Sequence, residues 1–313
     1  MQVVAAEFLS RGGPVLEPRP ATEDEVAAIH TRDYIGRVRD TAGRAATFDP
    51  DTFTSPDTYD VALLAAGAVL TAVERVLSDG PGTRALATVR PPGHHAERDR
   101  AMGFCLFNNV AIGAAKARAS GPSRVAVVDY DVHHGNGTQQ AFYEDPSVLV
   151  VSSHQYPYYP GSGAADQTGA GAGSGFTVNL PLDAGATDAD YEHVYRGVAE
   201  VLRQFRPQLI LLSAGFDAHR DDPFGGMHLT ANQFARLTAR MAAVADECCE
   251  GRLVVVTEGG YDLEALAASL RGVIDVLDGT TTLDRLPAPT GDTTRGEAAL
   301  AAARAHLGQR WTI

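Results

Sequence analysis

Five short apolar runs, separated by segments of helical periodicity, constrain the fold of this chain more than any other feature. The runs span residues 84–89, 124–128, 147–151, 208–212 and 253–257. Between the last two runs, Phe234, Leu237 and Met241 recur at the spacing of one helix face. Strands that alternate with helices predict a parallel sheet covered on both faces. We therefore predict an α/β fold, and with 44% hydrophobic residues the 313-residue chain can bury one large core.

Each apolar run is followed by polar residues that can carry chemistry. These segments span residues 90–96, 129–134, 152–154, 213–217 and 258–261. The carboxyl ends of the strands in an open α/β sheet border the crevice in which such sheets bind ligands. The sequence therefore predicts one polar site to which all five strand ends contribute.

The most specific of these segments holds an Asp-x-His at Asp131 and His133. Residues two apart on a strand share a face, so we expect Asp129, Asp131 and His133 to project together. Asp217 follows another buried run and can supply a further carboxylate. Three protein ligands and one open position are typical of catalytic zinc, which lowers the pKa of its water to about 7. We predict a zinc site formed by Asp131, His133 and Asp217, with the neighbouring His134 facing the other way.

Hydrolysis also needs groups that move protons and a donor for the developing oxyanion. His94 and His95 follow a Pro-Pro-Gly turn and can transfer protons, while Tyr261 can donate to the oxyanion. A carboxylate behind a histidine fixes its tautomer and raises its basicity, and Asp129 is placed to do this for one of the pair. The residue types therefore suffice for a metal-assisted hydrolase.

The strings that contain these residues resemble those of the histone deacetylase superfamily, which includes acetylpolyamine amidohydrolases and bacterial deacetylase-like amidohydrolases. They are RPPGHHAE (90–97), GFCLFNN (103–109), DYDVHHGNGTQ (129–139), SAGFDAHRDDPFGG (213–226) and EGGYD (258–262). The HHGNG and EGGY forms resemble the class II branch, and the resemblance covers roughly residues 15–280. It implies an arginase/deacetylase-like three-layer α/β/α sandwich with a mainly parallel sheet. Residues 1–313 would form a single catalytic domain with a peripheral C-terminal segment at 281–313.

The resemblance also implies roles for the residues around the metal. Ferrous iron is an alternative to zinc as the metal in the cell. His95 would act as general base and then as general acid, and His94 as its more electrostatic neighbour, backed by Asp129. Asn136 stands where class I enzymes carry a second aspartate behind His95. Tyr261 would polarise the substrate carbonyl.

A substrate tunnel and a potassium site follow from the resemblance alone. Phe104 and Tyr159 would form the aromatic walls of the tunnel, with Gly103 beside them and Phe224 at the rim. The structural potassium ion would use main-chain oxygens of Asp129, Asp131 and His133 together with Ser152.

The chain departs from the family pattern at its start. Relatives begin with a strand and an HPERPxR-like segment whose arginine lies near an internal cavity. This chain opens instead with MQVVAAEFLSRGGP and reaches the family pattern around residues 15–18. We expect the first strand and the arginine to be missing or replaced.

The amine that carries the acyl group is the open question. Phe224 occupies a rim position that is acidic in a polyamine-selective relative, which favours an acyl-lysine or a neutral amide. Glu97 is a candidate acid near the rim, so acetylpolyamines and small-metabolite amides remain alternatives. An arginase-type ureohydrolase would need further carboxylates where residues 134–136 read His-Gly-Asn. A non-catalytic, metal-plugged binding module would be expected to lack Tyr261 or the histidine pair.

The composition indicates which binding partners and which cellular compartment to expect. The formal net charge of -13 disfavours direct nucleic-acid binding and mildly favours cationic substrates. Cys105, Cys248 and Cys249 cannot form a disulfide framework, which indicates a reducing compartment. We find no signal peptide and no apolar run near the roughly 20 residues of a membrane span, and so expect a cytoplasmic protein without membrane contact. A homo-oligomer is compatible with the sequence.

Overall fold

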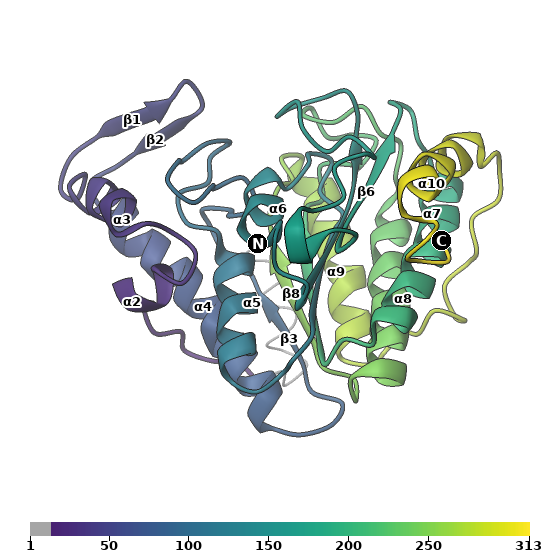
Figure 1. Cartoon of the computed structure of the whole chain (residues 1–313), viewed down its shortest axis with the longest axis horizontal. Helices are drawn as coiled ribbons and strands as arrows, with labels where there is room; N and C mark the ends of the chain where they lie inside the picture. The colour runs from purple at the N-terminus through teal and green to yellow at the C-terminus, as the bar shows by residue number, and fades with distance from the viewer. Residues whose placement is uncertain (1–13) are drawn as a thin grey trace.

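The computed structural model describes residues 14–313, and within them a six-stranded parallel sheet forms the centre of the molecule (Figure 1). The strand order is β3-β8-β7-β4-β5-β6. The strands are β3 (Arg84–Ala87), β4 (Val125–Asp129), β5 (Val148–Gln155), β6 (Thr177–Leu182), β7 (Leu209–Ala214) and β8 (Leu253–Thr257). The predicted parallel sheet is thus confirmed. The predicted departure at the start of the chain lies largely outside the described residues.

Helices cover both faces of the sheet, because successive strand residues point to opposite sides. Ala126 and Val128 pack against one helical layer, and Val125 and Val127 against the other. The first layer holds α7 (Asp188–Phe205), α8 (Ala231–Cys248), α9 (Leu263–Leu277) and α10 (Thr294–Leu307). The second holds α4 (Thr58–Ser78), α5 (Asn109–Ala119) and α6 (Asn136–Phe142). The two layers enclose the sheet as the predicted α/β/α sandwich (Figure 1).

An N-terminal subcluster extends from the far side of α4. It contains α2 (Glu23–Val26), α3 (Arg32–Arg39) and the antiparallel pair β1 (Ala46–Asp49) and β2 (Thr52–Thr54). Tyr34, Leu106 and Phe107 form part of its own buried core with α4. The hairpin reaches the site because Phe104 N donates to Thr52 Oγ1 at 3.1 Å.

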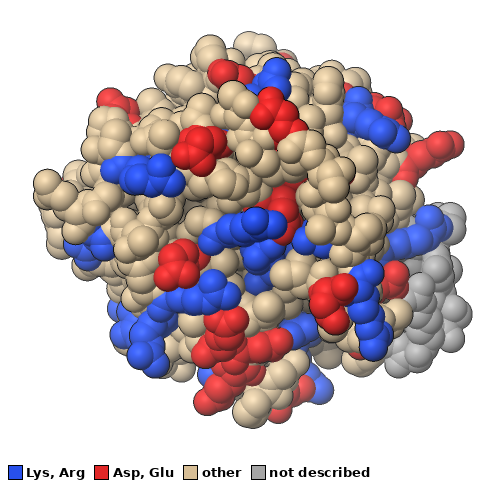
Figure 2. All heavy atoms as spheres, turned by 90° about the vertical axis from the view of Figure 1, so that its right-hand side faces the viewer, with Lys and Arg blue, Asp and Glu red and all other residues tan. Residues whose placement is uncertain are grey.

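The C-terminal segment packs against the open edge of the sheet. α10 contacts α7 and β6, and Leu300, Ala303 and Leu307 on it are buried. Trp311 Nε1 donates to Gly175 O at 2.6 Å, next to the short 3-10 turn η1 (Gly171–Gly173). Figure 2 shows acidic and basic side chains interspersed over the right-hand side of the molecule in Figure 1. Arg203 on α7 and Glu247 on α8 form an ion pair at 2.6 Å.

Helix α4 corrects the prediction that no apolar run approaches the length of a membrane span. It has 21 residues and is long and apolar enough by length and composition alone. Alanine, valine and leucine fill it because its buried face packs against α5 and β3. Half of its most apolar stretch is buried inside the molecule. The core helices of soluble proteins can have the same length and composition, so α4 is weak evidence for a membrane span.

Candidate metal centre and active site

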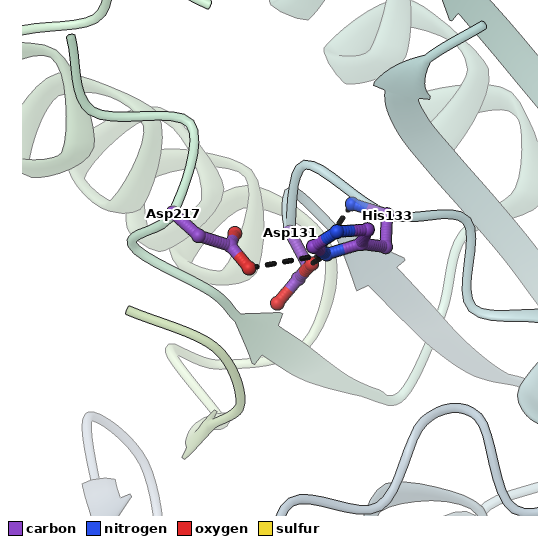
Figure 3. A group of neighbouring side chains, drawn as sticks. All are labelled: Asp131, His133 and Asp217. Carbon is purple, nitrogen blue, oxygen red and sulfur yellow. Dashed lines mark hydrogen bonds and ion pairs between the residues drawn. The ribbon is translucent and has the colours of Figure 1, made fainter. Parts of the chain in front are cut away.

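Asp131, His133 and Asp217 meet at the carboxyl ends of β4 and β7, which are neighbours in the sheet (Figure 3). His133 Nδ1 lies 3.0 Å from Asp131 Oδ1 and 3.2 Å from Asp217 Oδ2. One ligand atom from each residue lies within 4.8 Å of the others. The sequence prediction of a three-residue group is therefore confirmed.

The donor set fits a divalent metal ion. Asp217 Oδ2 is buried and has no hydrogen bond, although it faces the His133 imidazole. Burial and then the charge of Asp131 raise the pKa of Asp217, so a cation between the carboxylates would relieve their repulsion. Two carboxylates and one imidazole nitrogen are ligands that zinc accepts.

Glycine makes room for these carboxylates. A Cβ atom at Gly215 would lie 2.0 Å from Asp131 Oδ2, a distance that no side chain tolerates. Asp131 Oδ2 also accepts Gly259 N–H at 2.9 Å, which draws the end of β8 to the metal group. The SAGFD and EGGY strings thus bring three strand ends close together.

Contrary to the strand alternation, Asp129 does not project with Asp131 and His133, but it does lie behind a histidine, as its expected role requires. β4 ends at Asp129, and beyond it the chain turns, with Asp131 N donating to Asp129 Oδ1 at 3.0 Å. Asp129 Oδ2 instead lies 2.9 Å from His94 Nδ1. The structure thus places Asp129 behind His94, while only Asp131 and His133 meet.

The two adjacent histidines have opposite electrostatic environments. Burial lowers the pKa of His94, but the charges of Asp129 and Asp131 outweigh burial and raise it to about 10. Burial, and then the charge of His94, hold the pKa of His95 well below its ordinary value. Titratable pairs whose pKa values are pushed apart are suited to different roles in catalysis. This arrangement favours a cationic His94 beside a neutral His95.

Asn136 fixes the tautomer of His95. Its Nδ2 donates to Glu97 Oε1 at 2.8 Å, which turns its oxygen toward His95. Asn136 Oδ1 therefore accepts from His95 Nδ1 at 2.8 Å, and this leaves the Nε2 lone pair of His95 free. Glu97, a candidate rim acid from the sequence, lies behind Asn136 and does not line the cavity.

A cavity of about 210 Å³ leads to the metal group. The residues predicted to bind substrate, Gly103, Phe104, Tyr159 and Phe224, all line it, together with Tyr261, His94 and His95. Phe104 has a φ of 67°, a strained conformation for a non-glycine residue that is common at functional sites. Burial, and then the charges of Asp131 and Asp217, raise the pKa of Tyr261, so that its hydroxyl stays protonated.

His134 lies outside the metal group, as predicted from its place in the sequence. Its Nε2 lies 3.0 Å from Gln139 Oε1 and its Nδ1 lies 2.8 Å from Ser162 Oγ. The predicted potassium ligands are partly juxtaposed, because Ser152 pairs with Asp129 in the sheet register. Ser152 Oγ lies 2.9 Å from His154 Nδ1, and the potassium site stays a prediction.

Several residues of the site were not predicted from the sequence. Tyr158 stacks on His133 with ring centroids 5.5 Å apart, and Asp51 lines the mouth of the cavity. Glu258, buried beneath the histidines, accepts Gly93 N–H at 2.7 Å and Ser213 Oγ–H at 2.9 Å. The only sequence signal for Glu258 was its position at a strand end, and the hairpin that carries Asp51 was not predicted.

Known proteins share both the sequence and the fold. The sequence model of the histone deacetylase domain matches residues 2–277. A probable deacetylase of Archaeoglobus fulgidus is 41% identical over 267 residues, which cover 85% of this chain and 74% of that protein. The polyamine deacetylase HDAC10 of Homo sapiens is 43% identical over 280 residues, which cover 84% of this chain and 41% of the human protein.

A solved structure extends the match to the three-dimensional fold. The crystal structure of the HDA15 HD domain superposes with a TM-score of 0.90 at 34% identity, covering 99% of this chain and 86% of that one. The chain therefore corresponds to most of the archaeal protein and to less than half of the human one.

Proposed function

Because this chain belongs to the histone deacetylase family, we propose that it removes an acetyl or similar acyl group from the side-chain amine of an acyl-lysine. The observation that carries the proposal is the Asp131, His133 and Asp217 group, of which Asp131 and His133 line the cavity. His94, His95 and Tyr261 line the same cavity. A metal group, a proton-transfer pair and a hydroxyl donor are the requirements of amide hydrolysis.

Asp131, His133 and Asp217 would hold a divalent ion, for which zinc is our first choice and ferrous iron the alternative. When bound, the ion supplies Lewis acidity, which polarises a carbonyl and acidifies water. Main-chain oxygens of Asp129, Asp131 and His133, together with Ser152, would hold the proposed potassium ion.

Proton transfer is assigned to His95. Its neutral form has a free Nε2, which can take a proton from the attacking water and later pass it to the departing amine. The cationic His94, held by Asp129, stabilises the negative charge that develops on the oxygens of the tetrahedral transition state. The Tyr261 hydroxyl, which stays protonated, donates a hydrogen bond to the oxyanion.

The walls of the cavity favour a methylene stem. Phe104 and Tyr159 would enclose the stem, and Phe224 at the rim is 47% exposed and offers no charge to a secondary ammonium. An acetylpolyamine is the second candidate, because Asp51 lines the mouth and the chain is 43% identical to the polyamine deacetylase HDAC10. Asp51 could pair with a cationic amine.

A substrate panel separates the two candidates. The purified protein should hydrolyse acetyl-lysine peptides with a higher kcat/KM than acetylputrescine or acetylspermidine. Asp51→Asn should lower kcat/KM selectively for the cationic polyamines if the acid recognises them. Asp57→Asn is the matched control, because Asp57 is an exposed aspartate that caps no helix through its side chain. Polyamine rates about a hundredfold above the peptides, roughly 2.7 kcal/mol, would reverse our assignment.

A further inference from the structure

The buried carboxylate of Asp222 accepts three backbone N–H groups from two different loops. Asp222 Oδ2 accepts Tyr261 N–H at 2.6 Å and Asp262 N–H at 3.1 Å. Its other oxygen, Oδ1, accepts Phe224 N–H at 3.0 Å. Asp222 is 6% exposed, so water competes little for these bonds. An ionised acceptor makes shorter and stronger hydrogen bonds to N–H donors than a neutral one does.

These bonds fix the backbone that carries Tyr261. Gly260 precedes it with a φ of 130°, a conformation that side chains rarely adopt, so the backbone at this point depends on glycine. On the far side of Gly260, Gly259 N–H is held by Asp131 Oδ2. After Tyr261, Asp262 accepts Ala265 N–H at 2.8 Å and begins α9. Asp222 therefore supplies the anchor between the flexible glycine and the helix.

The same carboxylate connects Tyr261 to the rim of the cavity. The rings of Phe224 and Tyr261 lie 4.6 Å apart, and Tyr158 Oη donates to Phe224 O at 3.2 Å. Both Phe224 and Tyr261 depend on Asp222 for a backbone bond. Asp222 itself does not line the cavity, so its effect on a substrate must pass through these neighbours.

We propose that Asp222 is a positioning residue that holds the Tyr261 hydroxyl in place for the transition state and ties it to the Phe224 rim. This inference rests on the deacetylase function proposed above. A misplacement of about 1 Å in a reacting group can cost a hundredfold in rate. Loss of the carboxylate should therefore lower kcat and leave the metal group intact.

The first test compares Asp222→Asn with Asp221→Asn, its exposed neighbour. The asparagine keeps the shape but offers a single acceptor oxygen, so its amide nitrogen must face an N–H group. We expect kcat on an acetyl-lysine peptide to fall about tenfold to a hundredfold, with KM within about threefold. Asp221→Asn should behave as the unaltered protein. If Asp222→Asn folds poorly, Asp222→Glu, which keeps the charge and moves it, should lower kcat in the same way.

The second test asks whether Asp222 acts through Tyr261. Tyr261→Phe already lacks the hydroxyl that Asp222 would position. Adding Asp222→Asn to this variant should therefore lower kcat further by less than about threefold, and a double-mutant cycle measures this coupling. An equal loss in both backgrounds, an unchanged kcat in the single variant, or a loss of bound metal would overturn the proposal.

A third readout does not depend on turnover. Amide hydrogen exchange should rise in Asp222→Asn either at Phe224 or at residues 261–262, because one oxygen cannot accept the N–H groups of both loops, and it should stay unchanged in Asp221→Asn. If the unaltered protein hydrolysed no acyl amide while exchange rose as expected, the proposed function would fail and the anchoring would stand. Unchanged exchange would refute the anchoring whatever the activity.

Discussion

The floor and the mouth of the cavity are built differently. At the floor, Asp131 and Asp217 are fully buried and follow the central strands β4 and β7. At the mouth, Phe104 and Phe224 are 40% and 47% exposed and lie on loops outside any helix or strand. The ends of the central strands therefore place the metal group, while loops shape the contact with the amine.

This difference predicts two kinds of variant. Changes at the floor should lower kcat on every substrate, because they remove groups that act on the amide itself. Changes at the mouth should act mainly on KM and should depend on the substrate, because they remove uniform binding. Four variants test the separation, in order of decreasing effect.

Asp217→Ala should have the largest effect. It leaves two protein ligands where a catalytic zinc ion uses three, and the loss of metal assistance is worth several kcal/mol, or about a thousandfold or more in kcat/KM. Metal analysis of the purified variant should show well under one ion per chain. Stoichiometric zinc in Asp217→Ala would refute its role, and His134→Ala, which alters a histidine outside the metal group, should keep its metal.

Tyr261→Phe should come next. Removal of one oxyanion donor typically costs about a hundredfold to a thousandfold in kcat. KM, metal content and folding should change little, since only a hydroxyl is lost. Steady-state kinetics on an unactivated acetyl amide measure this, and a near-normal kcat would mean that the carbonyl is polarised without the tyrosine.

Asn136→Asp should have an effect that depends on pH. A carboxylate 2.8 Å from His95 Nδ1 would raise the low pKa of His95, and opposite charges at such distances shift pKa values by about 1 to 3. The base acts in its neutral form, so the acid limb of kcat/KM should move to higher pH, with activity lost below the new pKa. Asn136→Ala removes the hydrogen bond without adding charge. An upward shift in that variant too would exclude the electrostatic explanation.

Phe224→Ala at the mouth should have the smallest effect. Its half-exposed ring can lose about 1 kcal/mol of apolar contact with the substrate, so KM should rise about fivefold while kcat stays unchanged. Phe53→Ala is the matched control, because the Phe53 ring is 73% exposed and does not line the cavity. Phe224→Ala keeps the backbone bond to Asp222, so a large loss of kcat would show that the Phe224 ring itself positions Tyr261 and would erase the division between floor and mouth.

The floor of the site could be predicted from the sequence because its residues follow apolar runs in a fixed order. A buried parallel strand leaves few choices for where the next residues go, so Asp131, His133 and Asp217 could be placed at one edge. β6 was not predicted because Asn179 and Pro181 interrupt its apolar pattern. It lies at the edge of the sheet, where such residues are tolerated.

The mouth could not be predicted in the same way, because contacts between distant segments position it. Asp51 reaches the cavity through a hairpin that depends on the Thr52–Phe104 bond. Asp222 is followed by proline, which indicates a turn. The sequence did not indicate which three N–H groups its carboxylate would accept. Alternation along β4 predicted that Asp129 would project with Asp131 and His133, but the turn after the strand separates them, and Asp129 instead meets His94, the contact that its expected role behind a histidine requires.

Metal dependence of amide hydrolysis tests the central claim most directly. The protein should be stripped with a chelator, reloaded with one equivalent of zinc, and assayed for acetate release from an acetyl-lysine peptide. We predict no turnover in the stripped protein and full recovery at one ion per chain, with no recovery in Asp217→Ala. Undiminished acetate release from the stripped protein would contradict the assignment of Asp131, His133 and Asp217 as the centre of the reaction.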